Sequence, residues 1–302
     1  MHDDRIAVLP TRLMTESSPI QADPTPSSMP RTLESAVLRW FRKNWRTQLL
    51  GFSSLAALLL LWHLATLYRV DFFIRFTNIP TPVEVFHKVI EVNQSEKYLT
   101  NVLISLRRIL LGFLIAAVVG ISIGLIVGRY TLARQLVLPW MEVFRPIPAI
   151  AWVPMSIMLW PTNEISIVFI TFLGAVFPIF WNTMQGVQAI DKVLLRAARS
   201  LGAHELSLFR HVILPGVLPH IFTGLAVGMG VSWVSLIAAE MISGQFGVGY
   251  FTWEAYSLVS YSEIALGMIT IGLLGLFCSA VIRLIGVKLM PWLAFSLKES
   301  NT

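Results

Sequence analysis

The stretch ILLGFLIAAVVGISIGLIVG, residues 109–128, decides the fold class, because it contains twenty consecutive residues without a charge. An α-helix needs about 20 mainly apolar residues to cross the hydrocarbon core of a bilayer. Five more stretches of this kind occur in the chain. We therefore expect an all-α, polytopic integral membrane protein with about six transmembrane helices. They are predicted near residues 48–67, 109–128, 136–160, 165–187, 219–242 and 264–288.

The composition agrees with lipid as the main solvent. Of the 302 residues, 55% are hydrophobic and 13% are charged. A soluble domain carries about 25% charged residues, so an ordinary soluble enzyme is excluded. The single cysteine, Cys278, excludes a disulfide framework and a metal site built from several cysteines.

Two of the predicted spans have distinctive patterns. In 109–128, small residues recur every four positions, which lets another helix approach closely. In 136–160, four prolines predict a broken or kinked helix, which is tolerated at membrane depth only beside protein or a water-filled path. The small residues are Gly112, Ala116, Gly120, Gly124 and Gly128, and the prolines are Pro139, Pro146, Pro148 and Pro154.

Basic residues predict the orientation of the chain. Fourteen Lys and Arg residues flank the spans on the side that holds both termini, against six in the long loop 68–108 on the other side. Since cytoplasmic loops are enriched in Lys and Arg, we expect both termini in the cytoplasm. The net charge of +6 is therefore a topology signal, and no nucleic-acid partner is needed to explain it.

The remaining segments divide the chain into parts. Residues 1–30 are rich in Pro and Ser and predict a disordered cytoplasmic tail. A basic lead-in at 31–47 precedes a transmembrane domain at 48–292, and a cytoplasmic tail follows at 293–302. In the outer loop 68–108, Pro82 is suited to begin a helix that lies either on the membrane surface or against the protein.

The loop 188–218 is too long for a turn and has a helix-forming composition. Small residues at Ala197 and Ala198 allow another surface to approach, and Gly202 suits a sharp break after a helix. A second short helix is predicted from Glu205 to Arg210, with Leu214-Pro215 as its stop. Two short helices below the membrane are typical of a docking element for a cytoplasmic partner.

Charged residues inside the spans are candidates for function, since each costs about 2.5–3.5 kcal/mol at the bilayer centre. Arg145 lies three residues after Glu142, so it either pairs with Glu142 or attracts an anion. For Glu240, a gate contact, a docking contact or a bond to neighbouring backbone is favoured over contact with cargo. Trp152 either lines the path or packs in the protein. These three residues, Arg145, Trp152 and Glu240, are the candidate lining of a translocation path.

The loop 188–218 resembles the coupling loop of the permease subunits of ATP-driven ABC importers. The family pattern is E-A-A, three residues, G, nine residues, I, one residue, L-P. Arg196 stands where Glu is usual, and Val212 where Ile is usual. With Arg at this position, the loop resembles that of the family branch that imports sulfonates, taurine, nitrate or bicarbonate. The matching stretch comprises Arg196, Ala197, Ala198, Ser200, Leu201, Gly202, Val212, Leu214 and Pro215.

This resemblance implies a translocation subunit, not an enzyme, in the bacterial inner membrane. It implies two copies of the permease, two cytoplasmic ATPase subunits and an external solute-binding protein. The sequence contains no G-x-x-x-x-G-K-[ST] phosphate loop, so ATP and Mg are expected on the partner ATPase, with no cofactor in this chain. A small anion is the expected cargo. A neutral or cationic vitamin precursor or metabolite stays open, as does a secondary transporter.

Overall fold

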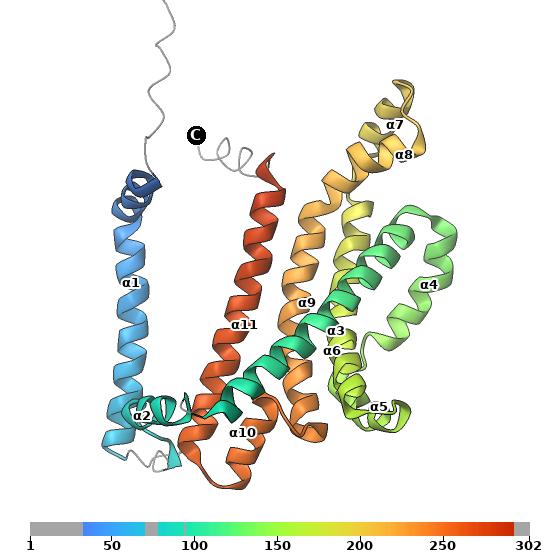
Figure 1. Ribbon diagram of the computed structural model, residues 1–302. Coiled ribbons are helices and arrows are strands. Elements are labelled where there is room, and N and C mark those ends of the chain that lie inside the picture. Colours follow the sequence, from blue (N-terminus) through green and yellow to red (C-terminus); the bar gives the residue numbers. More distant parts are fainter. Residues whose placement is uncertain (1–32, 70–77, 94, 293–302) are drawn as a thin grey trace, which may run out of the picture. The chain divides into compact units, whose positions relative to one another are not determined.

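The computed structural model describes residues 33–69, 78–93 and 95–292, and within these residues every regular element is helical (Figure 1). The predicted tails 1–30 and 293–302 lie outside the described residues. The first helix, α1 (Leu33–Leu67), crosses the boundary between two compact units that divide after Leu58. The packing described below is that of the second unit.

The prediction of about six membrane spans is confirmed by the length and composition of the helices. The third span consists of two helices that meet at a bend. Five helical segments are long and apolar enough to cross a membrane, and two shorter helices form a sixth if they are taken together. The five are Leu49–Leu67 of α1, α3 (Glu96–Arg129), α6 (Asn163–Gln188), Glu205–Ser243 and α11 (Tyr261–Leu289). The bent pair is α4 (Thr131–Phe144) with Ala149–Leu159, which meet at 85°.

The prediction that the outer loop 68–108 extends to residue 108 is wrong. Helix α3 begins at Glu96 and runs through Arg107 and Arg108 without interruption. Arg108 does not end the span because its side chain is buried and bonded to carboxylates of other helices. The two arginines therefore belong to a helix long enough to span the membrane and not to the loop.

The helix predicted to begin at Pro82 is confirmed as α2 (Pro82–Asn93). It begins with a capping box, in which the Glu84 N–H donates to Thr81 Oγ1 at 3.2 Å and the Thr81 N–H donates to Glu84 Oε2 at 3.1 Å. Lys88 on α2 forms an ion pair with Glu263 of α11 at 3.0 Å. Hydrogen bonding to Glu263 raises the pKa of Lys88. This helix therefore packs against the protein.

Close packing of the small-residue face of α3 is also confirmed. Gly112, Gly120, Gly124 and Gly128 are buried against α6. A Cβ added to Gly112 would lie 2.7 Å from Thr171 Cβ, and one added to Gly128 would lie 2.6 Å from Val187 Cβ. The two backbones can approach this closely only because these positions carry no side chain. Helices α3, α6 and α9 (Leu214–Ser243) share the main hydrophobic core.

Replacing Gly112 by alanine is expected to lower the free energy of unfolding by about 1–3 kcal/mol, because the added methyl group overpacks the seam between α3 and α6. Gly272 on α11 is the matched control, since a Cβ there meets nothing within 4 Å. Gly272→Ala is expected to be neutral or stabilising, by up to about 1 kcal/mol from helix propensity. Denaturation of both variants in detergent micelles measures the difference, and equal stabilities would contradict the packing.

Candidate functional site

The segment between α6 and α9 folds into two short helices that project from one end of the membrane helices (Figure 1). Helix α7 (Lys192–Ser200) is capped by Asp191, whose carboxylate accepts from the Val193 N–H at 2.7 Å. It ends at Ser200, and Gly202, two residues further on, has a φ of 83°. Helix α8 (Glu205–Leu208) follows. The pair of short helices expected from the sequence is thus confirmed.

Gly202 forms the end of α7 in a specific way. Its N–H donates to the Arg199 carbonyl at 3.0 Å, and the Ala203 N–H donates to the Ala198 carbonyl at 3.0 Å. This pair of bonds is a Schellman motif, which needs a left-handed residue at the position of Gly202. The turn between α7 and α8 is therefore set by a backbone conformation that few residues other than glycine adopt.

The predicted helix stop at Leu214-Pro215 is wrong. A π-helical turn, Phe209–Ile213, joins α8 directly to α9, and Glu205–Ser243 forms one apolar segment. Pro215 lies in the first turn of α9, where a missing N–H is tolerated. The short helix is consequently continuous with a membrane-spanning helix.

The sequence-matched residues of this segment separate into a tip and a base. Arg196, Ala197, Ser200, Leu201 and Gly202 are exposed at the tip. Leu201, at 89% exposure, is an apolar side chain with almost no cover from the chain itself. The partly buried base comprises Ala198, Val212, Leu214 and Pro215.

The base is fixed to the membrane helices by two kinds of contact. Ala198 and Val212 pack on a buried cluster that includes Leu208. Glu205 accepts from Arg129 Nη2 of α3 at 2.7 Å and from Arg199 Nη2 of α7 at 2.9 Å. The segment therefore presents an exposed tip with basic and apolar side chains on a base that packs against the membrane helices.

A second candidate site lies where the third predicted span is broken. Helix α4 ends at Phe144, and the chain turns at Pro146 and Pro148 into a 3₁₀ turn, Ala149–Trp152, and then α5 (Val153–Leu159). The prolines remove backbone N–H donors, so a regular helix cannot continue through them. The predicted break in this span is confirmed.

A half-open cavity of about 360 Å³ lies between the bend, α6 and α9, and is lined by Arg145, Trp152, Trp181 and Asn182, among others. The Arg145 guanidinium carbon lies 4.7 Å from the centre of the Trp181 ring, in a cation–π contact. None of the ion pairs among the described residues joins Arg145 to Glu142. The alternative of an internal Glu142–Arg145 pair is therefore wrong.

The α6 wall of this cavity adds a polar backbone group. Pro178 lies inside α6 and has no N–H, so the Gly174 carbonyl four residues earlier lacks its usual helical donor. Gly174 and Pro178 both line the cavity. The Asn182 side chain donates to the Pro178 carbonyl at 2.9 Å. Among the described residues, the cavity lining contains one cation and no carboxylate.

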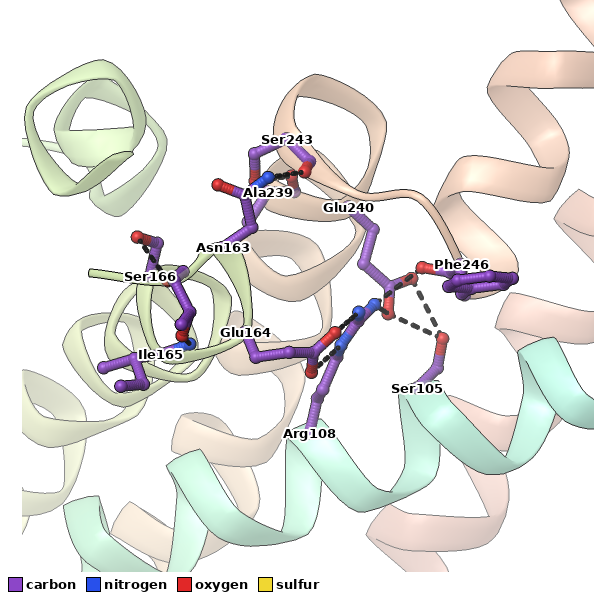
Figure 2. A network of polar contacts seen from close by, with 12 residues as sticks. Ser105, Arg108, Asn163, Glu164, Ile165, Ser166, Ala239, Glu240, Ser243 and Phe246 are labelled. Atoms are coloured by element: carbon purple, nitrogen blue, oxygen red, sulfur yellow. Dashed lines mark hydrogen bonds and ion pairs between the residues drawn. The ribbon is translucent and has the colours of Figure 1, made fainter. Parts of the chain in front are cut away.

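Glu240 lies elsewhere, in a buried ionic network between α3, α6 and α9 (Figure 2). Its carboxylate accepts from Arg108 Nη1 at 2.9 Å and from Ser105 Oγ at 2.8 and 2.9 Å. It also accepts from the Gly249 N–H at 2.9 Å, at the first turn of α10 (Val248–Ser257). A negative charge is favourable at a helix N-terminus. The expected bond to neighbouring backbone is present.

Arg108 is the centre of this network, and the sequence reasoning missed it. Its Nη1 also donates to the Phe246 carbonyl at 2.6 Å, and its Nε donates to Glu164 Oε2 at 3.0 Å. The Arg108 and Glu240 side chains are 2% and 0% exposed, whereas that of Glu164 is 61% exposed. The available signal was Glu240 itself, because a carboxylate within a span requires a partner.

The three candidate path residues are thus not brought together. Arg145 and Trp152 line one cavity, while Glu240 is buried in the network around Arg108 and does not line it. Within the described residues, no group of three or more His, Cys, Asp or Glu side chains is placed to hold a metal ion.

Comparison with known proteins gives a consistent result. Residues 100–294 match the family model described as "Binding-protein-dependent transport system inner membrane component". The nitrate import permease protein NrtB of Leptolyngbya laminosa is 38% identical over 62% of this chain and 67% of its own length. NrtB of Synechocystis sp. is 33% identical over 71% and 82%. The bicarbonate transport system permease protein CmpB of Synechococcus elongatus is 40% identical over 57% and 62%.

Proposed function

Because this chain belongs to the family of inner-membrane components of binding-protein-dependent transport systems, we propose that it forms the translocation path of an ATP-driven importer for a small oxyanion. The cargo class is that of nitrate or bicarbonate, the anions in the names of the relatives. The path would be built by two copies of the chain, supplied by an external solute-binding protein.

The segment from α7 to α9 is the proposed docking site of a partner ATPase, which would carry ATP and Mg. Its exposed tip offers Leu201 to a partner, and its base is continuous with α9. Closure of two ATPase subunits would therefore move membrane helices and bias the path between two states. This proposal puts the tip on the cytoplasmic side, and the charge pattern of the sequence predicts the same side for both termini.

The observation that carries the anion class is the single cation in the bent-helix cavity. Arg145 offers a planar fork of N–H donors that suits two oxygens of a planar or tetrahedral anion. Among the described residues, no carboxylate lines the cavity to repel such a cargo, since Glu240 lies in the separate network around Arg108.

Replacing Arg145 by alanine is expected to lower the uptake of labelled nitrate or bicarbonate by about 10- to 100-fold, since a hydrogen bond to a charged group contributes about 1.5–3 kcal/mol. Arg145→Lys keeps the charge but not the fork and should retain intermediate uptake. Arg283→Ala is the matched control, because Arg283 is exposed on α11 and does not line the cavity. Uptake by proteoliposomes that hold the full complex measures the difference. Unchanged uptake in Arg145→Ala would remove the argument for an anion.

A further inference from the structure

A second basic cavity lies beside the docking segment. It has a volume of about 370 Å³ and is formed where the α3–α4 corner meets the end of α6 and the start of α7. Arg129, Arg134 and Lys192 line it together with the polar side chains of Thr131 and Gln188. No Asp or Glu of the described residues lines it. Three cations thus line this space, and of these Arg129 is paired with Glu205 of the neighbouring groove, while the ion pairs among the described residues include neither Arg134 nor Lys192.

Arg134 lines this cavity and carries a donor that no acceptor of the described residues satisfies. Its Nη2 donates to the Gly128 carbonyl at the end of α3 at 3.2 Å, but its Nε is buried without a hydrogen-bond partner. A buried N–H without an acceptor is unfavourable, and more so on a charged group. The cavity also faces the first turn of α4 at Thr131, and Tyr130 provides no side-chain cap there. Both features favour an anionic acceptor.

An apolar groove adjoins the basic cavity and shares Arg129 and Ile213 with it. The groove has a volume of about 470 Å³ and is lined by Leu125, Ile126 and Phe209, among others. Its one carboxylate, Glu205, is bonded to Arg129 and Arg199. The basic cavity and the apolar groove therefore lie side by side at the ends of membrane-spanning helices.

We propose that this double cavity binds an anionic phospholipid, with the headgroup phosphate among Arg129, Arg134 and Lys192 and an acyl chain in the groove. A free phosphate would use the basic cavity but leave the apolar groove empty, so the lipid fits both parts. Basic pockets at the cytoplasmic ends of membrane helices suit such headgroups. Assignment of the cavity to the cytoplasmic leaflet depends on the orientation given under Proposed function. The bound lipid would join α4 to α7 at the base of the docking segment.

Native mass spectrometry of the purified full chain tests this site, with phosphatidylglycerol, phosphatidylcholine and inorganic phosphate as the three probes. We expect the first phosphatidylglycerol to bind about tenfold more tightly than phosphatidylcholine, and Arg134→Gln to remove that preference. Lys192→Gln, an exposed position at the start of α7, provides a second variant that does not depend on a buried side chain. Arg283→Gln removes the same charge from an exposed position outside the cavity and should leave the preference intact.

Equal losses in Arg134→Gln and Arg283→Gln would overturn the proposal, because the preference would then be diffuse electrostatic attraction. Equal binding of the two lipids, or displacement of phosphatidylglycerol by inorganic phosphate at the same concentration, would also overturn it. Because the assay involves neither transport nor ATP, its failure would leave the proposed import function intact.

Discussion

Replacing Arg108 by methionine is expected to lower the free energy of unfolding by about 3–5 kcal/mol, because removal of one partner leaves an uncompensated charge on buried Glu240. Glu164 loses a partner as well, but its exposed side chain can be solvated. Chemical denaturation of the purified protein in detergent micelles measures the loss. Of the stability changes expected here, this is the largest.

Two further variants decide whether the loss comes from the buried charge. Adding Glu240→Gln to Arg108→Met removes that charge and should restore a large part of the stability, so the two changes will not add. Lys97→Met is the matched control on α3, since Lys97 forms an exposed ion pair with Glu254 at 3.2 Å. Such pairs contribute about 0–1 kcal/mol. Additive losses, or a loss in Lys97→Met as large as in Arg108→Met, would contradict the network.

Gly202→Pro is expected to uncouple ATP hydrolysis from transport while the protein remains folded. Proline holds φ near −65°, which is incompatible with the φ of 83° at Gly202, and it also removes the N–H that bonds to Arg199. Since coupling free energies between sites are about 1–3 kcal/mol, we expect substrate-stimulated ATPase activity to fall by about 5- to 150-fold. The assay uses the complex with its ATPase and binding protein.

Gly202→Asn is the matched control, because asparagine tolerates the left-handed conformation. A Cβ at residue 202 meets nothing within 4 Å, so the asparagine side chain adds no clash. This variant should keep most of the coupled activity. If the proline variant hydrolyses ATP in response to substrate as well as the asparagine variant does, the turn after α7 has no part in coupling.

Local patterns in the sequence predicted most of the architecture. The apolar runs located the membrane helices, the prolines at 146 and 148 located the break, and Gly202 located the turn of the docking segment. Each of these features depends on residues that are neighbours in the chain. The small residues of α3 likewise predicted a close helix contact, although the sequence did not identify α6 as the partner.

The predictions from sequence failed where residues far apart in the chain, or an irregular helical turn, determine the local structure. The uncharged run begins at residue 109 and so predicts Arg108 in the loop, but Glu240, 132 residues away, pairs with Arg108 in the protein interior. Pro215 was taken as a helix stop because nothing in the local pattern reveals the π-helical turn before it. The cavity around Arg145 required Trp181 of α6, which no spacing argument connects to it.

ATP-dependent accumulation of labelled anion by proteoliposomes is the measurement that tests the central claim most directly. The vesicles contain the chain with its ATPase, and the solute-binding protein is added outside. We predict that nitrate or bicarbonate accumulates only when ATP and the binding protein are both present, and that Arg145→Ala abolishes most of it. Accumulation without the ATPase, or of neutral and cationic solutes alone, would contradict the account.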